Sequence, residues 1–347
     1  MEKLVIGMPA GSLADSKRGG SLVNLLEQAG FCTKGYEQGG PSTFKSINYL
    51  FGWDGRPQEF GSQLTIGELD VAIAGDDWIQ ERIYELELEY NTEIRLEKAL
   101  SLQRGDVRIV GIAPGDITCE NASDYLKELC ADKPIITVVS EMPYMALHWV
   151  RSCLEALGLL DEYSDFSVQN YKTPPKIEKG ILIYQTWGKT EAKLRNGGAD
   201  IGLEITQSGS AIRNYGLRII DEIMSSETSI WINPAIRNDT EKSDLLDMFL
   251  LNLYGAINAE DKVMLLFNVA NPDADVIEQY LSENNLFANE PTVNRGKDFT
   301  QYSIQVDAGG AKQPVARIRY ELARIGAKNI DTIPLLSSIP SLDCVRP

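Results

Sequence analysis

The run GADIGLEITQSGSAIRNYGLRIIDEIMSSETSIWINP, from Gly198 to Pro234, decides the fold of this chain of 347 residues. Residues 199–206 are mostly apolar and predict a buried strand, which leads into a loop of small residues and then into a short helix. A strand that passes through a loop into a helix is the building unit of α/β proteins. The run therefore predicts an α/β lobe with a loop that can face a ligand.

The same unit recurs toward the N-terminus. The strand-like run KLVIGM (residues 3–8) precedes a Gly/Ser turn and the helical run SLVNLLEQAGF. A second strand, LDVAIAG (69–75), leads into the helical run WIQERIYELELEY. Further strands are predicted at residues 107–114, 134–140 and 181–186, with helical stretches between them. This alternation predicts two α/β lobes.

The pattern changes character after a polar stretch at residues 235–244, where we expect a domain boundary. A linking helix is followed by VMLLFNV, a helical run, EPTVNRG, YSIQVDAG, a second helical run and NIDTIPLL. Strand, helix, strand, strand, helix, strand is the ferredoxin-like order. The C-terminal third is therefore predicted to be a separate ferredoxin-like domain.

Composition excludes several classes of protein. Hydrophobic residues make up 43% of the chain and charged residues 24%, as in globular proteins, and no apolar run is long enough for a membrane span. The start MEKLVIGMPAG shows no targeting signal, so we expect a cytoplasmic protein that does not associate with membranes. Five scattered cysteines and a single histidine, His148, give no readable zinc site.

The formal net charge of −17 argues against nucleic-acid binding, which depends on clustered Lys and Arg. In so acidic a chain, a phosphate ligand would depend on backbone N–H groups, a few cations and Mg²⁺. Ser208, Gly209 and Ser210 have the composition of such a phosphate nest, because glycine allows close approach and the hydroxyls can donate. A serine-capped turn without a ligand is the alternative interpretation.

The order of residues in this run resembles the phosphate-binding signature of ATP phosphoribosyltransferases. The family positions are occupied here by Asp200, Glu204, Ser208, Gly209, Ser210, Gly216 and Leu217. Other segments resemble the family in the same order along the chain: Gly11-Ser12-Leu13, Arg56 to Gly61, Gly67 to Asp77, Gly188 to Glu191, and parts of the C-terminal region. The resemblance covers nearly the whole chain, with insertions before residue 63 and around residues 80–100.

The resemblance implies two lobes like those of periplasmic binding proteins and a C-terminal ferredoxin-like regulatory domain. The lobes would comprise residues 1–106 with 218–238, and residues 107–217 with the phosphate loop; the regulatory domain would comprise residues 239–347. It also implies Mg²⁺-dependent transfer of the phosphoribosyl group of phosphoribosyl pyrophosphate to N1 of ATP, the first step of histidine biosynthesis. A homo-oligomer, in the family a hexamer, and inhibition by histidine are implied in the same way.

Site residues follow from the resemblance, residue by residue. Catalytic roles are expected for Glu204, Arg56 and Asp77. Phosphate binding is expected for Gln207, Ser208, Gly209, Ser210 and Ala211. Nucleotide binding is expected for Gly11, Ser12, Leu13, Gly75, Asp76 and Glu191. No metal ligand can be named from the sequence.

The sequence also departs from the family pattern. Ala211 stands where the family has a second threonine, Glu204 replaces an aspartate, and no Lys or Arg lies next to Gly11. These changes leave open a divergent homologue that binds a small molecule without catalysis, or a phosphoribosyltransferase with a different acceptor. Asp76 and Asp77 could be solvated loop acids, and His148 lies on an amphipathic helix as a packed or surface residue.

Overall fold

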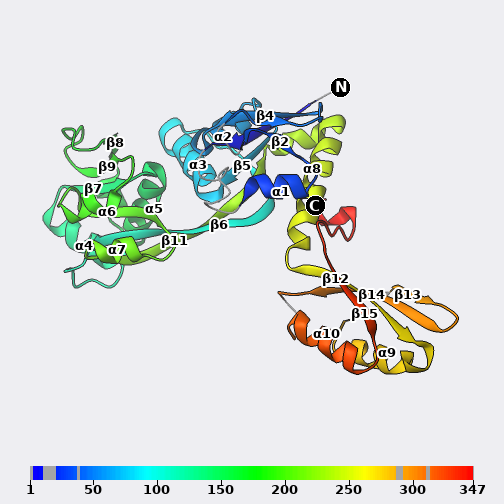
Figure 1. Cartoon of the computed structure of the whole chain (residues 1–347). Helices are drawn as coiled ribbons and strands as arrows, with labels where there is room; N and C mark the ends of the chain where they lie inside the picture. Colours follow the sequence, from blue (N-terminus) through cyan, green and yellow to red (C-terminus); the bar gives the residue numbers. More distant parts are fainter. Residues whose placement is uncertain (1–2, 11–20, 37–39, 287–291, 310–312, 347) are drawn as a thin grey trace. The chain divides into compact units, whose positions relative to one another are not determined.

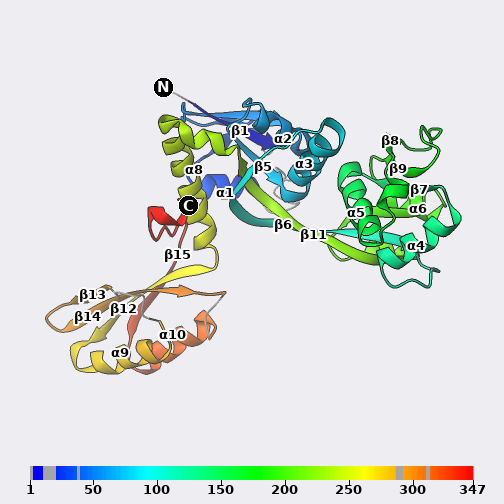
Figure 2. The same cartoon turned by 180° about the vertical axis from the view of Figure 1, so that it is seen from behind.

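The computed structural model describes residues 3–10, 21–36, 40–286, 292–309 and 313–346 (Figures 1 and 2). The chain divides into two compact units. The first comprises Met1–Val23 and Thr33–Leu246, and the second comprises Asn24–Cys32 and Asp247–Pro347. Among the described residues, no helix combines the length and the apolar character that a membrane span requires.

The first lobe of the larger unit is built on three parallel strands in the order β4-β1-β5. Leu4, Ile6 and Met8 of β1 are fully buried, as expected for an apolar run in the middle of a sheet. The elements of this lobe are β1 (Leu4–Pro9), β4 (Leu50–Gly55), α2 (Pro57–Thr65), β5 (Val71–Gly75) and α3 (Asp76–Tyr90). A two-stranded ribbon of β2 (Thr33–Lys34) and β3 (Thr43–Phe44) lies in the insertion that precedes β4.

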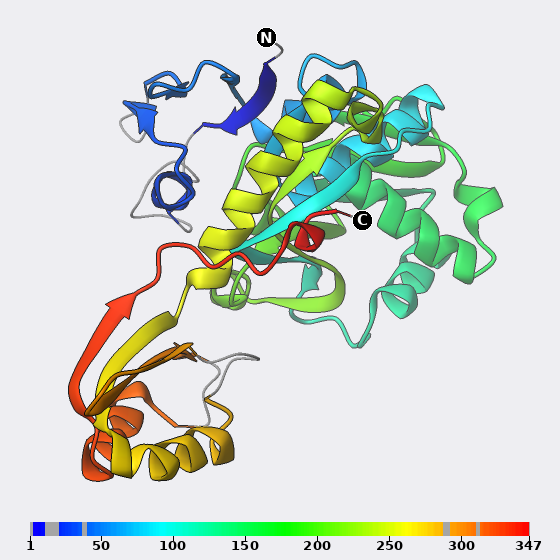
Figure 3. The same cartoon turned by 90° about the vertical axis from the view of Figure 1, so that its right-hand side faces the viewer.

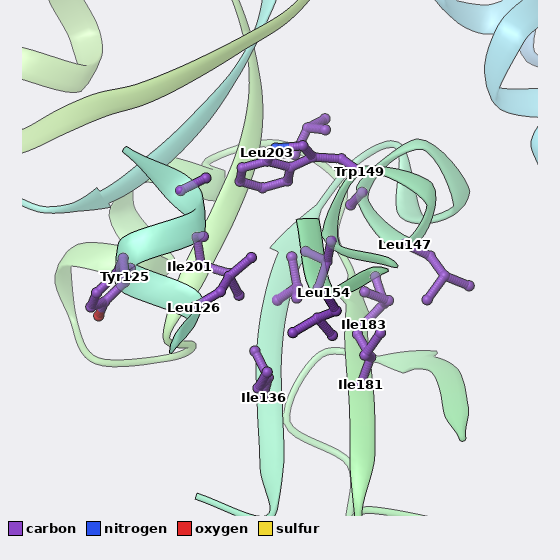
Figure 4. Packing of buried hydrophobic residues seen from close by; sticks show 14 of the residues in the cluster. Tyr125, Leu126, Ile136, Leu147, Trp149, Leu154, Ile181, Ile183, Ile201 and Leu203 are labelled. Atoms are coloured by element: carbon purple, nitrogen blue, oxygen red, sulfur yellow. The ribbon is translucent and has the colours of Figure 1, made fainter. Parts of the chain in front are cut away.

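The second lobe contains four parallel strands in the order β10-β7-β9-β8. Its core packs Trp149 and Leu154 of α5 against aliphatic side chains of these strands (Figure 4). Gly111 lies under the indole of Trp149, where an added Cβ would come within 2.3 Å of the ring. The elements are α4 (Ala122–Asp132), β7 (Ile135–Ser140), α5 (Pro143–Ala156), η2 (Leu160–Tyr163), β8 (Phe166–Asn170), β9 (Gly180–Gln185), α6 (Thr190–Arg195), β10 (Ile201–Thr206) and α7 (Ser210–Asn214).

Two long antiparallel strands join the lobes: β6 (Glu97–Pro114) and β11 (Leu217–Ile232). The C-terminal part of β11 pairs with β5 of the first lobe, and the C-terminal part of β6 pairs with β10 of the second. The result is one nine-stranded sheet, and Figure 1 shows both strands passing from lobe to lobe. The expectation of a strand starting at residue 107 was wrong by ten residues, because the polar residues 97–106 lie on the part of β6 that crosses between the lobes.

The second unit follows the order β12, α9, β13, β14, α10, β15, with the antiparallel sheet order β13-β14-β12-β15. This is the predicted ferredoxin-like order. Figure 3 shows its two helices on the same side of the sheet, where they enclose a core that includes Phe267 and Tyr302. The elements are β12 (Lys262–Ala270), η4 (Asn271–Asp273), α9 (Ala274–Glu283), β13 (Thr292–Arg295), β14 (Phe299–Asp307), α10 (Val315–Arg324), β15 (Lys328–Pro334) and η5 (Leu342–Cys344).

Helix α8 (Thr240–Ala259) belongs to both units, because the division falls between Leu246 and Asp247. The short η3 (Pro234–Asn238) precedes it. Helix α1 (Leu22–Gln28) contributes most of its length to the second unit, in which Phe31 packs on Phe249 with ring centroids 5.0 Å apart. An α/β fold with two lobes is thus confirmed, and the assignment of residues to the three expected domains stays a proposal.

Candidate functional site

A cavity of 510 Å³ lies where the ends of strands from both lobes meet. Side chains at the carboxyl ends of parallel strands converge on one edge of a sheet, which is where α/β proteins bind ligands. In the first lobe, β4 and β5 end at this cavity, and in the second β10 does. The expected site residues on its wall are Arg56, Gly75, Asp77 and Gln207.

A second cavity of 410 Å³ adjoins the first and shares Val107, Gln207, Ser226 and Glu227 with it. Its wall includes Asp76 and Lys98. Lys98 Nζ lies 2.7 Å from a carboxylate oxygen of Asp76 and 2.7 Å from one of Glu227, so its charge is already matched by two acids. This triplet ties the start of α3 to both strands that join the lobes.

Asp76 and Asp77 are not the solvated loop acids that one interpretation of the sequence suggested. Both lie in the first turn of α3, where acidic side chains are favoured by the helix dipole. Asp77 is 5% exposed, and its Oδ1 accepts the N–H of Trp78 at 3.0 Å. Burial raises the pKa of Asp77, and a hydrogen bond with the Ser226 hydroxyl opposes this rise. Asp76 accepts a hydrogen bond from the Trp231 indole at 3.0 Å.

Gly75 is required next to Asp77. A Cβ added at Gly75 would lie 2.2 Å from Oδ1 of Asp77, so any larger residue would displace this carboxylate from the cavity wall. Arg56 precedes the first turn of α2 with an exposed side chain. The expected Gly11, Ser12 and Leu13 lie outside the described residues, and Ala10, which precedes them, lines the cavity.

In the loop after β10, two backbone N–H groups donate hydrogen bonds to nearby hydroxyl side chains. The N–H of Gly209 donates to Thr206 Oγ1 at 2.9 Å, and the N–H of Ser210 donates to Ser208 Oγ at 3.3 Å. Gly209 has a φ of +70°, which glycine adopts without strain. Ser208 and Ser210 have hydroxyls 3.0 Å apart in an exposed setting. Ala211 is also exposed, and neither cavity reaches the four residues 208–211.

Glu204 lies at the end of the same strand, in a group of three carboxylates. Burial raises its pKa to about 7, and repulsion from Glu191 and, more weakly, Glu141 adds to the rise. Its Oε1 accepts the N–H of Ile205 at 3.1 Å, while its buried Oε2 has no hydrogen-bond partner. The structure thus brings Glu204 and Glu191 together, although the resemblance implied separate roles for them.

Two aspartates of the quoted motifs are structural. Asp200 accepts the N–H of Thr137 at 2.8 Å and its hydroxyl at 2.6 Å, and returns its own N–H to the Thr137 carbonyl at 3.0 Å. In the first lobe Asp70 makes the same exchange with Val5, at 2.9 Å in both directions. Each aspartate joins the start of its strand to the neighbouring parallel strand. A Lys side chain pairs with each carboxylate: Lys133 with Asp200 and Lys242 with Asp70.

Several residues of the cavity wall and of the carboxylate group around Glu204 were not predicted from the sequence. Ser226 and Glu227 belong to the SSET segment of β11, where small polar residues interrupt an apolar strand, and that interruption was the available signal. Lys98 and Glu141 carried no such signal, because their neighbours come from distant parts of the chain. His148 is stacked on Tyr84, with ring centroids 3.9 Å apart, and burial lowers its pKa.

Comparison with known proteins gives a consistent result. The family model of ATP phosphoribosyltransferase matches residues 56–254, which is more than half of the chain. The ATP phosphoribosyltransferase of Nitratidesulfovibrio vulgaris (strain DP4) is 27% identical over 331 residues, covering 90% of this chain and 92% of the relative. That of Geotalea uraniireducens (strain Rf4) is 27% identical over 340 residues, covering 96% and 97%.

A solved structure, the ATP phosphoribosyl transferase (HisG:HisZ) complex from Thermotoga maritima, is similar with a TM-score of 0.47 and 16% identity. That similarity covers 72% of this chain and 98% of the other.

Proposed function

Because the chain belongs to the ATP phosphoribosyltransferase family, we propose that it transfers the phosphoribosyl group of phosphoribosyl pyrophosphate to N1 of ATP. The reaction releases pyrophosphate and is the first step of histidine biosynthesis. The observation that carries this proposal is the 510 Å³ cavity between the strand ends of two lobes, most of whose wall lies within the matched residues 56–254.

The chemistry suits a site without a nucleophile. The lone pair of N1 forms the bond to the anomeric carbon as the bond from that carbon to pyrophosphate breaks, and the electron pair leaves on pyrophosphate. Catalysis then consists of aligning two reactants and stabilising the charges that develop. The packed position of His148 agrees with this, since no general base is needed for the attack.

In the second lobe we assign the ribose hydroxyls to Glu204 and the 5-phosphate to Ser208, Gly209 and Ser210. An ionised Glu204 accepts hydrogen bonds from hydroxyls, and its buried, unpartnered Oε2 supports this role. A phosphate at the loop would replace the Ser208 hydroxyl as acceptor of the Ser210 N–H. Gln207 borders both cavities and the loop, and we assign it to the same phosphate site. Ala211 offers no hydroxyl to the phosphate, so we expect transfer to be slow.

The facing wall would bind the nucleotide and the pyrophosphate. Arg56 supplies a positive charge at the cavity, and Gly75 allows close approach of a ligand to the start of α3. Asp76 and Glu191 are proposed nucleotide contacts. Gly11, Ser12 and Leu13 keep their proposed nucleotide role on the resemblance alone.

Mg²⁺ is the proposed cofactor. No group of three or more His, Cys, Asp or Glu side chains within the described ranges could hold a metal ion by itself. Mg²⁺ is commonly bound through one or two carboxylates together with substrate phosphates. Asp77, a carboxylate on the cavity wall, fits that requirement and is the residue that would hold the ion beside the pyrophosphate. When bound, the ion neutralises charge on the leaving group.

The site assignment is tested by Gly209→Asp against Gly209→Asn. Both variants keep the left-handed backbone that Asn and Asp tolerate, and they differ only in charge. Calorimetry with Mg²⁺ and phosphoribosyl pyrophosphate should show binding lost in Gly209→Asp and retained, though weakened, in Gly209→Asn, because a carboxylate repels phosphate. Equal affinity in both variants would contradict a phosphate at this loop.

A homo-oligomer, with the hexamer of the family, and inhibition by histidine through the C-terminal unit are further parts of the proposal, as is a cytoplasmic location. They rest on the resemblance to the family.

A further inference from the structure

The buried carboxylate of Glu81 links the two lobes beside the cavity. Glu81 lies on α3 of the first lobe and is 7% exposed. Its two carboxylate oxygens accept the N–H groups of Tyr144 at 3.0 Å and Met145 at 2.6 Å, in the first turn of α5 of the second lobe. The first N–H groups of a helix have no partner within the helix, and Met142, at the N-cap position of α5, provides no side-chain acceptor. Glu81 therefore caps α5 from the other lobe.

The surrounding contact is extensive enough to fix the geometry of this cap. Trp78, Tyr84 and Leu88 of α3 pack against the core of the second lobe. The ring of Tyr84 stacks on His148 of α5. Since α3 also continues directly from β5, movement of α5 relative to α3 would change the distance between the two lobes at this point.

Ionised Glu81 costs stability where it lies. Burial raises its pKa to about 7, although the two N–H groups of α5 and Arg82 favour the charged form. The other titratable groups that interact with it are Glu85 on α3 and Tyr144 on α5. His148 of α5, which stacks on Tyr84, has its pKa lowered by burial. A neutral side chain of the same size would be cheaper to bury.

Glu81 also connects the helix that carries Asp77 to the carboxylates around Glu204. Asp77, on the wall of the 510 Å³ cavity, is one helical turn before it on α3. Glu141 immediately precedes the N-cap residue of α5, receives the N–H of Gly188 and lies close enough to Glu204 to raise the pKa of that carboxyl. The cap thus connects the element that carries Asp77 to the element that carries Glu141.

We infer that Glu81 is a positioning residue, which sets the distance between the Asp77 wall and the carboxylates around Glu204 by capping α5 from α3. Its catalytic consequence rests on the proposed function, because that function places the ribose near Glu204 and the attacking nucleotide against the wall that carries Asp77. A misplacement of about 1 Å between aligned reactants can lower a rate about a hundredfold.

The test is Glu81→Gln with Glu85→Gln as the matched control. The glutamine side chain keeps the size of the glutamate, but its amide has one oxygen and can accept only one of the two N–H groups. Glu85 lies one turn along the same helix and pairs with Arg82, so its replacement removes the same charge without touching the cap. The readouts are amide exchange at Tyr144, Met145 and Gly188, steady-state kinetics, and thermal unfolding at about pH 8, where Glu81 is ionised.

For Glu81→Gln we expect faster exchange at all three amides and a kcat about 10- to 100-fold lower, with KM for each substrate changed less than about threefold. The midpoint of unfolding should not fall at this pH, because removal of the buried charge offsets the loss of one hydrogen bond. The control should match the parent in amide exchange and kcat, because it leaves both N–H groups of α5 capped. Unchanged exchange at Gly188, unchanged kcat, or kcat and the midpoint falling together would overturn the inference. If the folded parent shows no transferase activity, the proposed function fails, and exchange at Gly188 decides the positioning role alone.

Discussion

At the scale of single residues, Glu204 shows how the structure sharpens a role that the sequence could only name. Its place at the end of an apolar strand was readable, but the crowding by Glu191 and Glu141 was not, because the three carboxylates come from separate elements. Burial and that repulsion raise its pKa to about 7. Both consequences, for stability and for activity, can be measured.

Glu204→Gln should stabilise the protein at alkaline pH. The pKa of Glu204 is raised above its ordinary value of 4.5 in the folded state, so the folded protein loses stability as the pH rises toward about 7 and the carboxyl ionises. The variant has no such loss, and its midpoint of unfolding should exceed that of the parent at about pH 8 but match it at about pH 4. Equal midpoints at both pH values would show that the environment of Glu204 is wrong.

The same variant should lower kcat/KM about ten- to hundredfold, the effect of losing hydrogen bonds to a charged group. Glu155→Gln, which alters an exposed carboxylate on α5, should change neither property and serves as the control. A Glu204→Gln enzyme as active as the parent would remove Glu204 from the ribose site.

At the scale of elements, the two lobes share one structural feature. A short helix leads through a turn to an aspartate that binds the neighbouring parallel strand: α2 and Asp70 next to β1, and α6 and Asp200 next to β7. The strand orders β4-β1-β5-β11 and β9-β7-β10-β6 also correspond, each ending in one of the long antiparallel strands. No repeat was visible in the sequence, because the two lobes correspond in strand order and strand pairing. The two aspartates are the part of this correspondence that we identify in the sequence.

Asp200→Ala and Asp70→Ala should therefore affect stability more than chemistry. Each leaves a partly buried strand N–H without its acceptor, which costs about 1–3 kcal/mol of unfolding free energy. Asp132→Ala, at the end of α4, should cost much less, because its side chain has no such strand partner. Denaturant unfolding measures the three costs. Activity per folded molecule should be retained in all three variants, and a large loss for Asp200→Ala alone would give this residue a direct catalytic role.

At the scale of the whole molecule, the alternation of strands and helices and the ferredoxin-like order were predictable from apolar periodicity. The continuation of β6 back to Glu97 was not predictable, because the segment that crosses between the lobes is polar. It forms a strand by pairing with β11, which lies far away in the sequence. From the sequence, the cavity was predictable only to the extent that loops at the ends of strands from both lobes were expected to face a ligand. Ser226, Glu227 and Lys98 reach the site through that long-range pairing.

A truncation after Ala259 should leave a folded two-lobed core, whereas one after Pro234 should not. The shorter chain loses all of α8, and with it Lys242, whose ammonium group lies 2.7 Å from the carboxylate of Asp70. The shorter chain also lacks Phe249, which packs on Phe31 in the full chain, and its absence exposes an apolar surface beside α1. Cooperative thermal unfolding of the longer fragment and aggregation of the shorter one are the expected results. Two equally stable fragments would show that α8 is dispensable for the lobes.

The transferase activity is tested by pyrophosphate release from phosphoribosyl pyrophosphate, measured with ATP, GTP, CTP and UTP in turn, with the nucleotide product identified by mass spectrometry. We expect slow release that depends on ATP and on Mg²⁺, with a product whose mass is that of ATP plus one phosphoribosyl group. Release with another nucleotide in place of ATP, or no release by the folded protein with any of the four, would contradict it.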